Sequence, residues 1–217
     1  MNKTTANDSR LIISYLTLRK SIGLLGITFP FVLVFGGFVI NEEVQSSISY
    51  YYHTSMRDIF VAVLCIVATF LLAYKGYEKK DDIAGNIAGF SAFGVAMIPT
   101  TVENGATSTQ EWLGSIHLLF AFVYFCSIAY FCLFLFTKSD GTVQTARKKQ
   151  RNVIYKSCGY IIIACLALIG VHGLLPDDIR ASLSRIDPLF WLESIAIVAF
   201  GFSWLCKGEA ILKDEVK

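Results

Sequence analysis

Charged residues are scarce in this chain: they make up 17% of its 217 residues, whereas about a quarter is usual for a soluble domain. The sequence also has no P-loop, no G-x-S-x-G, no H-E-x-x-H and no dinucleotide-binding fingerprint. ATP-driven chemistry and the common hydrolase families therefore have no support. None of the six cysteines forms a C-x-x-C pair, which argues against disulfide exchange.

Hydrophobic residues, by contrast, make up 54% of the chain. Six apolar runs are each about long enough to cross a ~30 Å hydrocarbon core as a helix. The runs are continuously apolar, whereas the strands of a membrane barrel alternate in polarity. The sequence therefore predicts an all-α integral membrane protein, a single six-helix bundle over residues 1–217 with spans near 22–40, 55–74, 83–99, 112–136, 153–175 and 190–205.

Lysine and arginine are distributed unevenly between the two sides that these spans define. Sixteen of the nineteen fall on the side of both termini, and Arg57, Arg180 and Arg185 fall on the other. Because cytoplasmic loops carry the excess of basic residues, we expect an N-in, C-in protein of a bacterial-type inner (plasma) membrane. The expected partners are membrane lipids and not nucleic acid. The run Arg147–Arg151 is interpreted first as one of these topology signals in a short loop, and contact with anionic headgroups is the alternative. Nothing in the sequence indicates an oligomeric state.

The third predicted span is rich in small residues, including the pair Gly85-x-x-x-Gly89. Small residues let helix backbones approach closely in lipid, where no hydrophobic effect drives helices together. This span is therefore predicted to lie at the centre of the bundle.

Ionisable and hydroxyl side chains recur near the predicted outer ends of several spans. Ionisable groups inside spans are costly and usually face the protein interior or a water-filled cavity, where they pair with one another. We therefore expect these side chains to converge on one pocket: Ser49, His53, Asp58, His117, His172 and Glu193.

Three imidazoles, those of His53, His117 and His172, form a ligand set suited to catalytic zinc, which keeps three protein ligands and one open position. Zinc would lower the pKa of its bound water to ~7 and create a nucleophile. In this interpretation Asp58 is a fourth ligand or orients the water, Glu193 is the general base, and Ser49 is an oxyanion donor or supports a ligand. The sequence then predicts a zinc hydrolase that acts on a lipid-like substrate from the outer leaflet.

The segment Ser49-x-x-x-His53 at the start of a span, with an aspartate and further histidines on other helices, resembles the signature of the CREST superfamily. These multi-span hydrolases include alkaline ceramidases and the progestin and adipoQ receptors, and the resemblance implies zinc chemistry on a lipid-like substrate. The chain has six predicted spans rather than seven and lacks the H-x-x-x-H pair on the last span. The strings Tyr51-Tyr-His53-Thr-x-x-Arg57-Asp58 and Pro188-x-Phe-Trp191-Leu-Glu193 are similar to an uncharacterised bacterial family of small multi-span membrane proteins, which implies no activity.

Three alternatives fit the same residues. In a non-enzymatic protein the polar groups would only hold the bundle together, with His53 beside the tyrosines and Arg57 paired with Asp58 or Glu193. His117 and His172 could instead be the axial ligands of a b-type haem. A small-solute pathway would use Arg57, Asp58 and Glu193 as gating charges. The sequence leaves open whether the protein is an enzyme.

Overall fold

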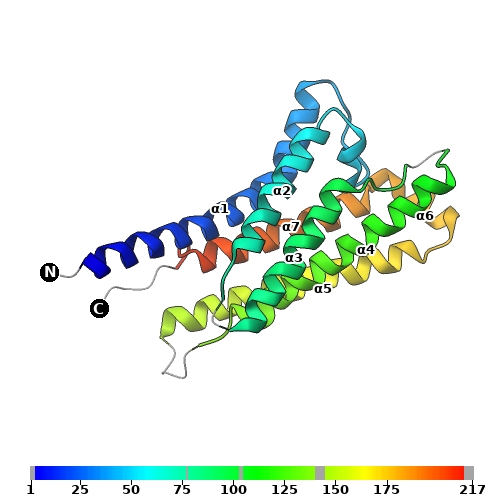
Figure 1. Cartoon of the computed structure of the whole chain (residues 1–217). Helices are drawn as coiled ribbons and strands as arrows, with labels where there is room; N and C mark the ends of the chain where they lie inside the picture. The colour runs from blue at the N-terminus through cyan, green and yellow to red at the C-terminus, as the bar shows by residue number, and fades with distance from the viewer. Residues whose placement is uncertain (1–2, 77, 103–104, 140–144, 213–217) are drawn as a thin grey trace.

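The computed structural model describes residues 3–76, 78–102, 105–139 and 145–212, and every regular element within these ranges is helical. Two 3₁₀ turns, η1 at Ser49–His53 and η3 at Ser184–Ile186, lie between helices, and the π-helical turn η2 at Phe131–Leu135 continues the fourth helix. The α-helices labelled in Figure 1 are α1 Lys3–Val39, α2 Arg57–Ala73, α3 Lys79–Met97, α4 Ser108–Tyr130, α5 Ala146–Gly173, α6 Asp177–Leu183 and α7 Pro188–Lys207.

Among the described residues, four segments are long and apolar enough to cross a membrane: Tyr15–Val39 of α1, Ser108–Leu135 across α4 and η2, all of α5 and all of α7. Their outward faces carry large apolar side chains, and Phe35 and Phe38, for example, are 71% and 76% exposed. Apolar surface of this extent is unfavourable in water and favourable in lipid. The all-helical class is therefore confirmed, and the chain has the helices of a membrane protein.

The helices α2 and α3 occupy two of the six predicted spans but are less suited to crossing a membrane. At 1.5 Å per residue the 17 residues of α2 extend only about 26 Å, slightly less than a ~30 Å core. The helix α3 begins with four charged residues, Lys79 to Asp82. The number of crossings, the N-in, C-in orientation and the identity of the membrane therefore stay predictions.

The six long helices close a ring in the order α1, α2, α3, α4, α5, α7, and α4 also contacts α7 across it. At one end of the molecule, where α1 begins and α7 ends, α3 and α5 also begin (Figure 1). We call this the basic end, and the opposite end, where η1 lies, the histidine end. Two of the basic residues counted in the sequence, Lys213 and Lys217, lie outside the described residues.

The small residues of α3 bring it close to α2, as the sequence predicts. A Cβ atom on Gly85 would lie 2.9 Å from the carbonyl oxygen of Leu71, and one on Gly89 would lie 2.9 Å from that of Ala68. The predicted central position is wrong, however, because α3 packs against α2 and α4 as one member of the ring. A pattern of small residues indicates that two helices approach closely, but it does not indicate how many helices surround the one that carries it.

Gly89→Leu is expected to lower the thermal stability of the protein in detergent far more than Phe134→Leu. The larger side chain at position 89 would collide with Leu72 and with the α2 backbone, whereas Phe134 is 58% exposed on the outer surface. Overpacking of this kind costs about 1–3 kcal/mol. The melting temperatures of the two variants check this, and equal values would contradict the close α2–α3 contact.

An even closer contact joins α1 to α7, and the sequence analysis did not identify it. A Cβ atom on Gly201 would lie 2.6 Å from the backbone nitrogen of Ile27 and 2.7 Å from the carbonyl oxygen of Gly23. From the other side, a Cβ atom on Gly26 would lie 2.9 Å from the Cα of Gly201. The two backbones therefore touch directly, and this contact positions α7 against the middle of the membrane-spanning part of α1.

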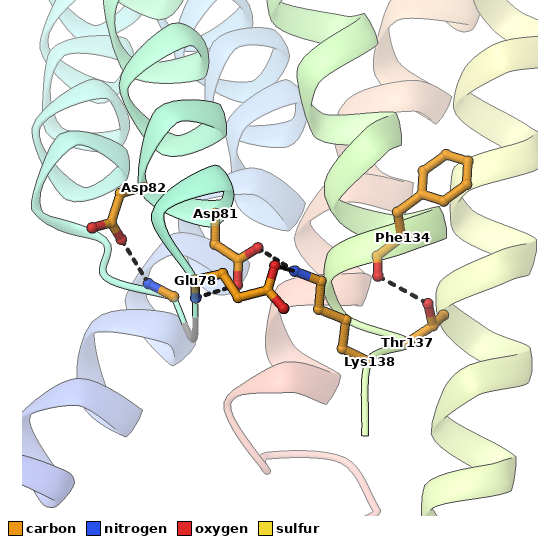
Figure 2. A network of polar contacts seen from close by, with 7 residues as sticks. Glu78, Asp81, Asp82, Phe134, Thr137 and Lys138 are labelled. Atoms are coloured by element: carbon orange, nitrogen blue, oxygen red, sulfur yellow. Dashed lines mark hydrogen bonds and ion pairs between the residues drawn. The ribbon is translucent and has the colours of Figure 1, made fainter. Parts of the chain in front are cut away.

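An ion-pair network at the basic end ties the start of α3 to the end of η2 (Figure 2). The Nζ of Lys138 lies 2.6 Å from Oδ1 of Asp81 and 3.2 Å from Oε2 of Glu78. Asp81 is buried and also closes a capping box with Glu78 at the first turn of α3. The carboxylate of Asp82 accepts a hydrogen bond from the backbone of Gly76 at 3.0 Å. The network fixes the α2–α3 connection against α4.

This network makes the stability of the protein depend on pH in the alkaline range. The hydrogen bond to Asp81 raises the pKa of Lys138 above its ordinary value of 10.5. A group whose pKa is raised on folding contributes its full stabilisation below the ordinary value and loses it as the pH passes through the higher, folded value. We expect Lys138→Met to lose about 1–2 kcal/mol at neutral pH, because it leaves the buried Asp81 without this partner.

Thermal melts of the wild type and of Lys138→Met between pH 8 and 11.5 measure this dependence. The difference in melting temperature should be constant up to about pH 10 and should narrow above it. A difference that stayed the same up to pH 11.5 would contradict a charge-dependent role for Lys138.

Candidate functional site

The candidate site is organised by η1, the short 3₁₀ turn between α1 and α2. Its tyrosines Tyr51 and Tyr52 are buried, and Ile48, which precedes it, is 2% exposed. The backbone N–H of Phe190, at the start of α7, donates to the carbonyl of Ser46 at 3.0 Å. Packing and this hydrogen bond therefore hold η1 against α7 at the histidine end.

Ser49 and Glu193, two of the predicted catalytic residues, are in direct contact. The Oε2 of Glu193 accepts a hydrogen bond from the backbone N–H of Ser49 at 3.0 Å, and Oε1 lies 3.5 Å from the Ser49 hydroxyl. The backbone N–H of Ile48 also donates to this carboxylate. The first N–H groups of a helix have no partner within it, so the Glu193 carboxylate caps η1. This contact is a structural one, and the predicted general-base and oxyanion roles stay predictions.

His117, on α4, is 2% exposed and is fixed through one ring nitrogen. Its Nδ1 lies 2.6 Å from the carbonyl oxygen of Ile98, just after α3. Because a carbonyl can only accept, Nδ1 carries the proton and Nε2 presents a lone pair. That Nε2 is buried and has no hydrogen-bond partner in the described part of the chain. A buried imidazole lone pair without a partner is costly and is the clearest indication of a ligand at this end of the molecule.

His53, at the end of η1, is held by the same stretch of backbone. Its Nε2 donates to the carbonyl of Thr100 at 2.8 Å, and its ring packs against those of Tyr50 and Tyr52 at 5.3 and 5.5 Å between centroids. The carbonyls that hold the two histidines, those of Ile98 and Thr100, are two residues apart in the chain. Each ring thus donates to a backbone carbonyl through one nitrogen, which is the arrangement usual for histidines that bind a metal through the other.

The remaining predicted residues do not join this pair. His172 is half-buried in the last turn of α5, and Asp58 is exposed in the first turn of α2; neither forms a hydrogen bond or ion pair with the other predicted residues in the described chain. Within the described ranges, no three His, Cys, Asp or Glu side chains are grouped so as to hold a metal ion. The zinc set of His53, His117 and His172 and the haem alternative therefore stay predictions.

Arg57 has a different partner from the one expected in the non-enzymatic interpretation. Its Nη2 donates to the hydroxyl of Tyr52 at 2.9 Å, and its guanidinium lies 4.5 Å from the centre of that ring. It forms no ion pair with Asp58 or Glu193 in the described part of the chain. Arg57 is thus bound to Tyr52 of η1 and does not pair with the carboxylates of Asp58 and Glu193.

A small internal cavity of about 40 Å³ lies next to Glu193 between α1, α2, α3, α4 and α7. Apolar side chains such as Phe29, Phe60 and Phe200 line it, and Tyr124 and Ser49 also border it. A space of this size accommodates at least one water molecule, which needs polar partners to be held. The Glu193 carboxylate supplies such a partner.

A much larger apolar groove of about 1,530 Å³ opens between α1, α5 and α7. Glu42 and Glu43 lie at its rim. Its length is lined by aromatic side chains: Phe31, Phe35, Phe38, Phe190, Trp191 and Phe202. The Oε1 of Glu42 accepts a hydrogen bond from the backbone N–H of Ser55 at 2.8 Å, and this bond lowers the pKa of Glu42 below its ordinary value. Its Oε2 is buried and has no hydrogen-bond partner among the described residues. The groove therefore combines an apolar length with two carboxylates at its rim, and the pKa of one of them, Glu42, is lowered.

No family model, curated protein or solved structure matches this chain. The likenesses seen in the sequence therefore stay expectations, and the site is argued from its own geometry. Sequence reasoning missed the carbonyls of Ile98 and Thr100, which orient the two histidines, because a backbone acceptor has no sequence signal. It also missed Glu42, which sits in a loop.

Proposed function

We propose that this chain is a multi-pass membrane protein that binds a transition-metal ion, zinc in the first instance, through His53 and His117 at the histidine end. The observation that carries the proposal is the Nε2 of His117, which is buried without a partner while Nδ1 is fixed by the Ile98 carbonyl. An imidazole held in this way has its tautomer and orientation set for a metal ion.

The fit to a catalytic zinc site is partial. Such a site takes three protein ligands, and each of the two imidazoles has one ring nitrogen fixed by a backbone carbonyl. His172 and Asp58 are the predicted sources of a third ligand. The arrangement supports metal binding and supplies no hydrolytic step of its own.

Zinc binding to purified protein tests the proposal, by metal analysis and by competition with a chromophoric chelator. We expect one zinc per chain in the wild type, and at least a tenfold weaker affinity in His53→Ala and in His117→Ala. His172→Ala discriminates between the two kinds of site: an equal loss supports a three-histidine, catalytic-type site, and no loss supports a site of two histidines. Zinc binding that is unchanged in the His53→Ala, His117→Ala double variant would refute the proposal. Melting temperatures of the metal-free variants control for folding.

The large apolar groove between α1, α5 and α7 supports the idea that the substrate at the histidine end is lipid-like. Its aromatic lining suits acyl chains, and the ionised Glu42 suits a headgroup that carries an ammonium. If the protein is a hydrolase, zinc-loaded protein should release fatty acid from an amine-headed lipid ester or amide. Glu42→Gln should weaken substrate binding, whereas His117→Ala should abolish turnover. Equal release by the His117→Ala variant would remove the hydrolase assignment.

One observation favours a non-enzymatic role. Glu193 is engaged with the backbone of η1 and holds the α1–α2 connection against α7. Under this alternative, the polar groups at the histidine end stabilise the bundle. The zinc measurement separates the two functions, because a purely structural histidine pair has no reason to bind stoichiometric metal.

A further inference from the structure

Four cationic side chains from three helices meet at the basic end. Lys207, the last residue of α7, lies within electrostatic reach of Arg19 on α1 and of Lys148 and Arg151 on α5. Arg151 is 9% exposed and the other three are half-buried. We call these four residues the basic cluster. Like charges at such positions repel more strongly than on an open surface, because water screens them less.

Contacts of the cluster hold Lys148 and Lys207 beside Phe136 and hold Arg151 beside Leu212. The Nζ of Lys148 donates to the carbonyl of Phe136 at 2.9 Å, and the Nη1 of Arg151 lies 3.4 Å from the carbonyl oxygen of Leu212. The Nζ of Lys207 lies 5.4 Å from the centre of the Phe136 ring. Asp81 attracts Lys207, but its carboxylate is bonded to Lys138 at 2.6 Å.

A second, independent observation concerns hydrogen-bond donors beside the cluster. Within the residues that the structure describes, the Nε of Arg19 and the Nε1 of Trp204 are both buried and have no hydrogen-bond partner. The two side chains flank the same ring, since the Arg19 guanidinium lies 6.0 Å from the centre of Tyr74, and the rings of Tyr74 and Trp204 are 5.4 Å apart. Both groups can only donate. These two N–H groups therefore need a hydrogen-bond acceptor at this position.

We propose that the basic cluster binds a phosphate group, supplied in the membrane by the headgroup of an anionic phospholipid. Guanidinium groups match the geometry of phosphate oxygens, and two of the four cations are arginines. Basic pockets between helices at the cytoplasmic side are where such headgroups bind, and this end carries the excess of Lys and Arg. This site is independent of the one proposed at the histidine end.

Purified full-length protein in neutral detergent provides the test. It is titrated with phosphatidylglycerol and, separately, with phosphatidylcholine of the same acyl chains, while the melting temperature and native mass spectra are recorded. At saturation we expect phosphatidylglycerol to raise the melting temperature by about 5 °C and phosphatidylcholine to raise it by less than half as much. Native spectra should show one tightly held phosphatidylglycerol.

Three single variants locate the effect. Lys148→Gln and Arg19→Gln should lose most of the response that is specific to phosphatidylglycerol. Lys149→Gln removes the same charge from the neighbouring, exposed position on α5 and should keep the full response. If Arg19→Gln does not fold, the Lys148→Gln and Lys149→Gln pair decides the question.

Two outcomes overturn the proposal. Equal stabilisation by the two lipids, or an undiminished response in Lys148→Gln, removes the basic cluster as a headgroup site. Inorganic phosphate at constant ionic strength distinguishes the source of the anion: no effect supports the lipid headgroup, whereas a response as large as that to phosphatidylglycerol assigns the site to free phosphate and overturns the lipid assignment.

Discussion

Replacing Gly201 with alanine is expected to destabilise the protein by about 3 kcal/mol, the upper part of the range for overpacking a core. The new methyl group would lie 2.6 Å from the backbone nitrogen of Ile27, and α1 and α7 would have to separate along the contact to relieve the clash. Neighbouring backbone cannot move aside as the end of a flexible side chain can. Thermal melts in detergent should show a drop of roughly 6–12 °C, at 2–4 °C per kcal/mol for a chain of this size.

Gly170→Ala is the matched control for this substitution. Gly170 lies within α5, and a Cβ atom there meets nothing within 4 Å. Alanine in an open helical position is favoured over glycine by about 0.5–1 kcal/mol, so this variant should be as stable as the wild type or slightly more stable. If both variants melted at the same temperature, the direct α1–α7 backbone contact would be disproved.

Glu193→Leu is expected to cost about 2–3 kcal/mol and to loosen the turn η1. Leucine removes the acceptor for the backbone N–H groups of Ile48 and Ser49, and a buried donor left without a partner costs about 1–3 kcal/mol. The adjacent cavity of about 40 Å³ gives the leucine room, so the loss should not come from a clash. Hydrogen exchange at the Ser49 amide should accelerate together with the fall in melting temperature.

Glu193→Gln separates the capping role from a role of the charge. Glutamine keeps a carbonyl acceptor, so most of the stability and of the amide protection should be retained. A Gln variant as unstable as the Leu variant would show that the negative charge matters more than the hydrogen bonds. Unchanged exchange at Ser49 in the Leu variant would contradict the capping role altogether.

The helical class and the positions of four helices of membrane-spanning length could be predicted from the sequence because both depend on local composition. Continuous apolar runs specify helices in lipid, whatever their neighbours are. The same locality explains an error: the small residues of α3 do bring it close to α2, yet its place in the ring depends on which faces the other helices present. The glycine contact of α1 with α7 escaped notice because Gly23, Gly26 and Gly201 are unremarkable until the two helices are set side by side.

The candidate site shows the same difference between what local sequence predicts and what depends on tertiary contacts. The sequence placed Ser49 and Glu193, 144 positions apart, in one layer, and they do meet. His53 and His117 are held by backbone carbonyls two residues apart, those of Thr100 and Ile98. The sequence did not anticipate that the Glu193 carboxylate caps a turn, because that role depends on the direction of backbone N–H groups. It also grouped His172 and Asp58 with the others from their depth along the predicted spans. Depth does not specify which face of its helix a residue lies on.

By itself, the sequence determined that this chain is helical and has helices long and apolar enough to cross a membrane. It also determined that basic residues lie at one end and histidines at the other. These properties follow from hydrophobicity and charge, which act residue by residue. Only the tertiary structure decided which of those residues meet, because contacts depend on helix rotation, on glycines that admit a second backbone and on carbonyls that orient a ring. It is this arrangement that leaves one nitrogen of His117 without a partner among the described residues and gathers three further cations around Lys207.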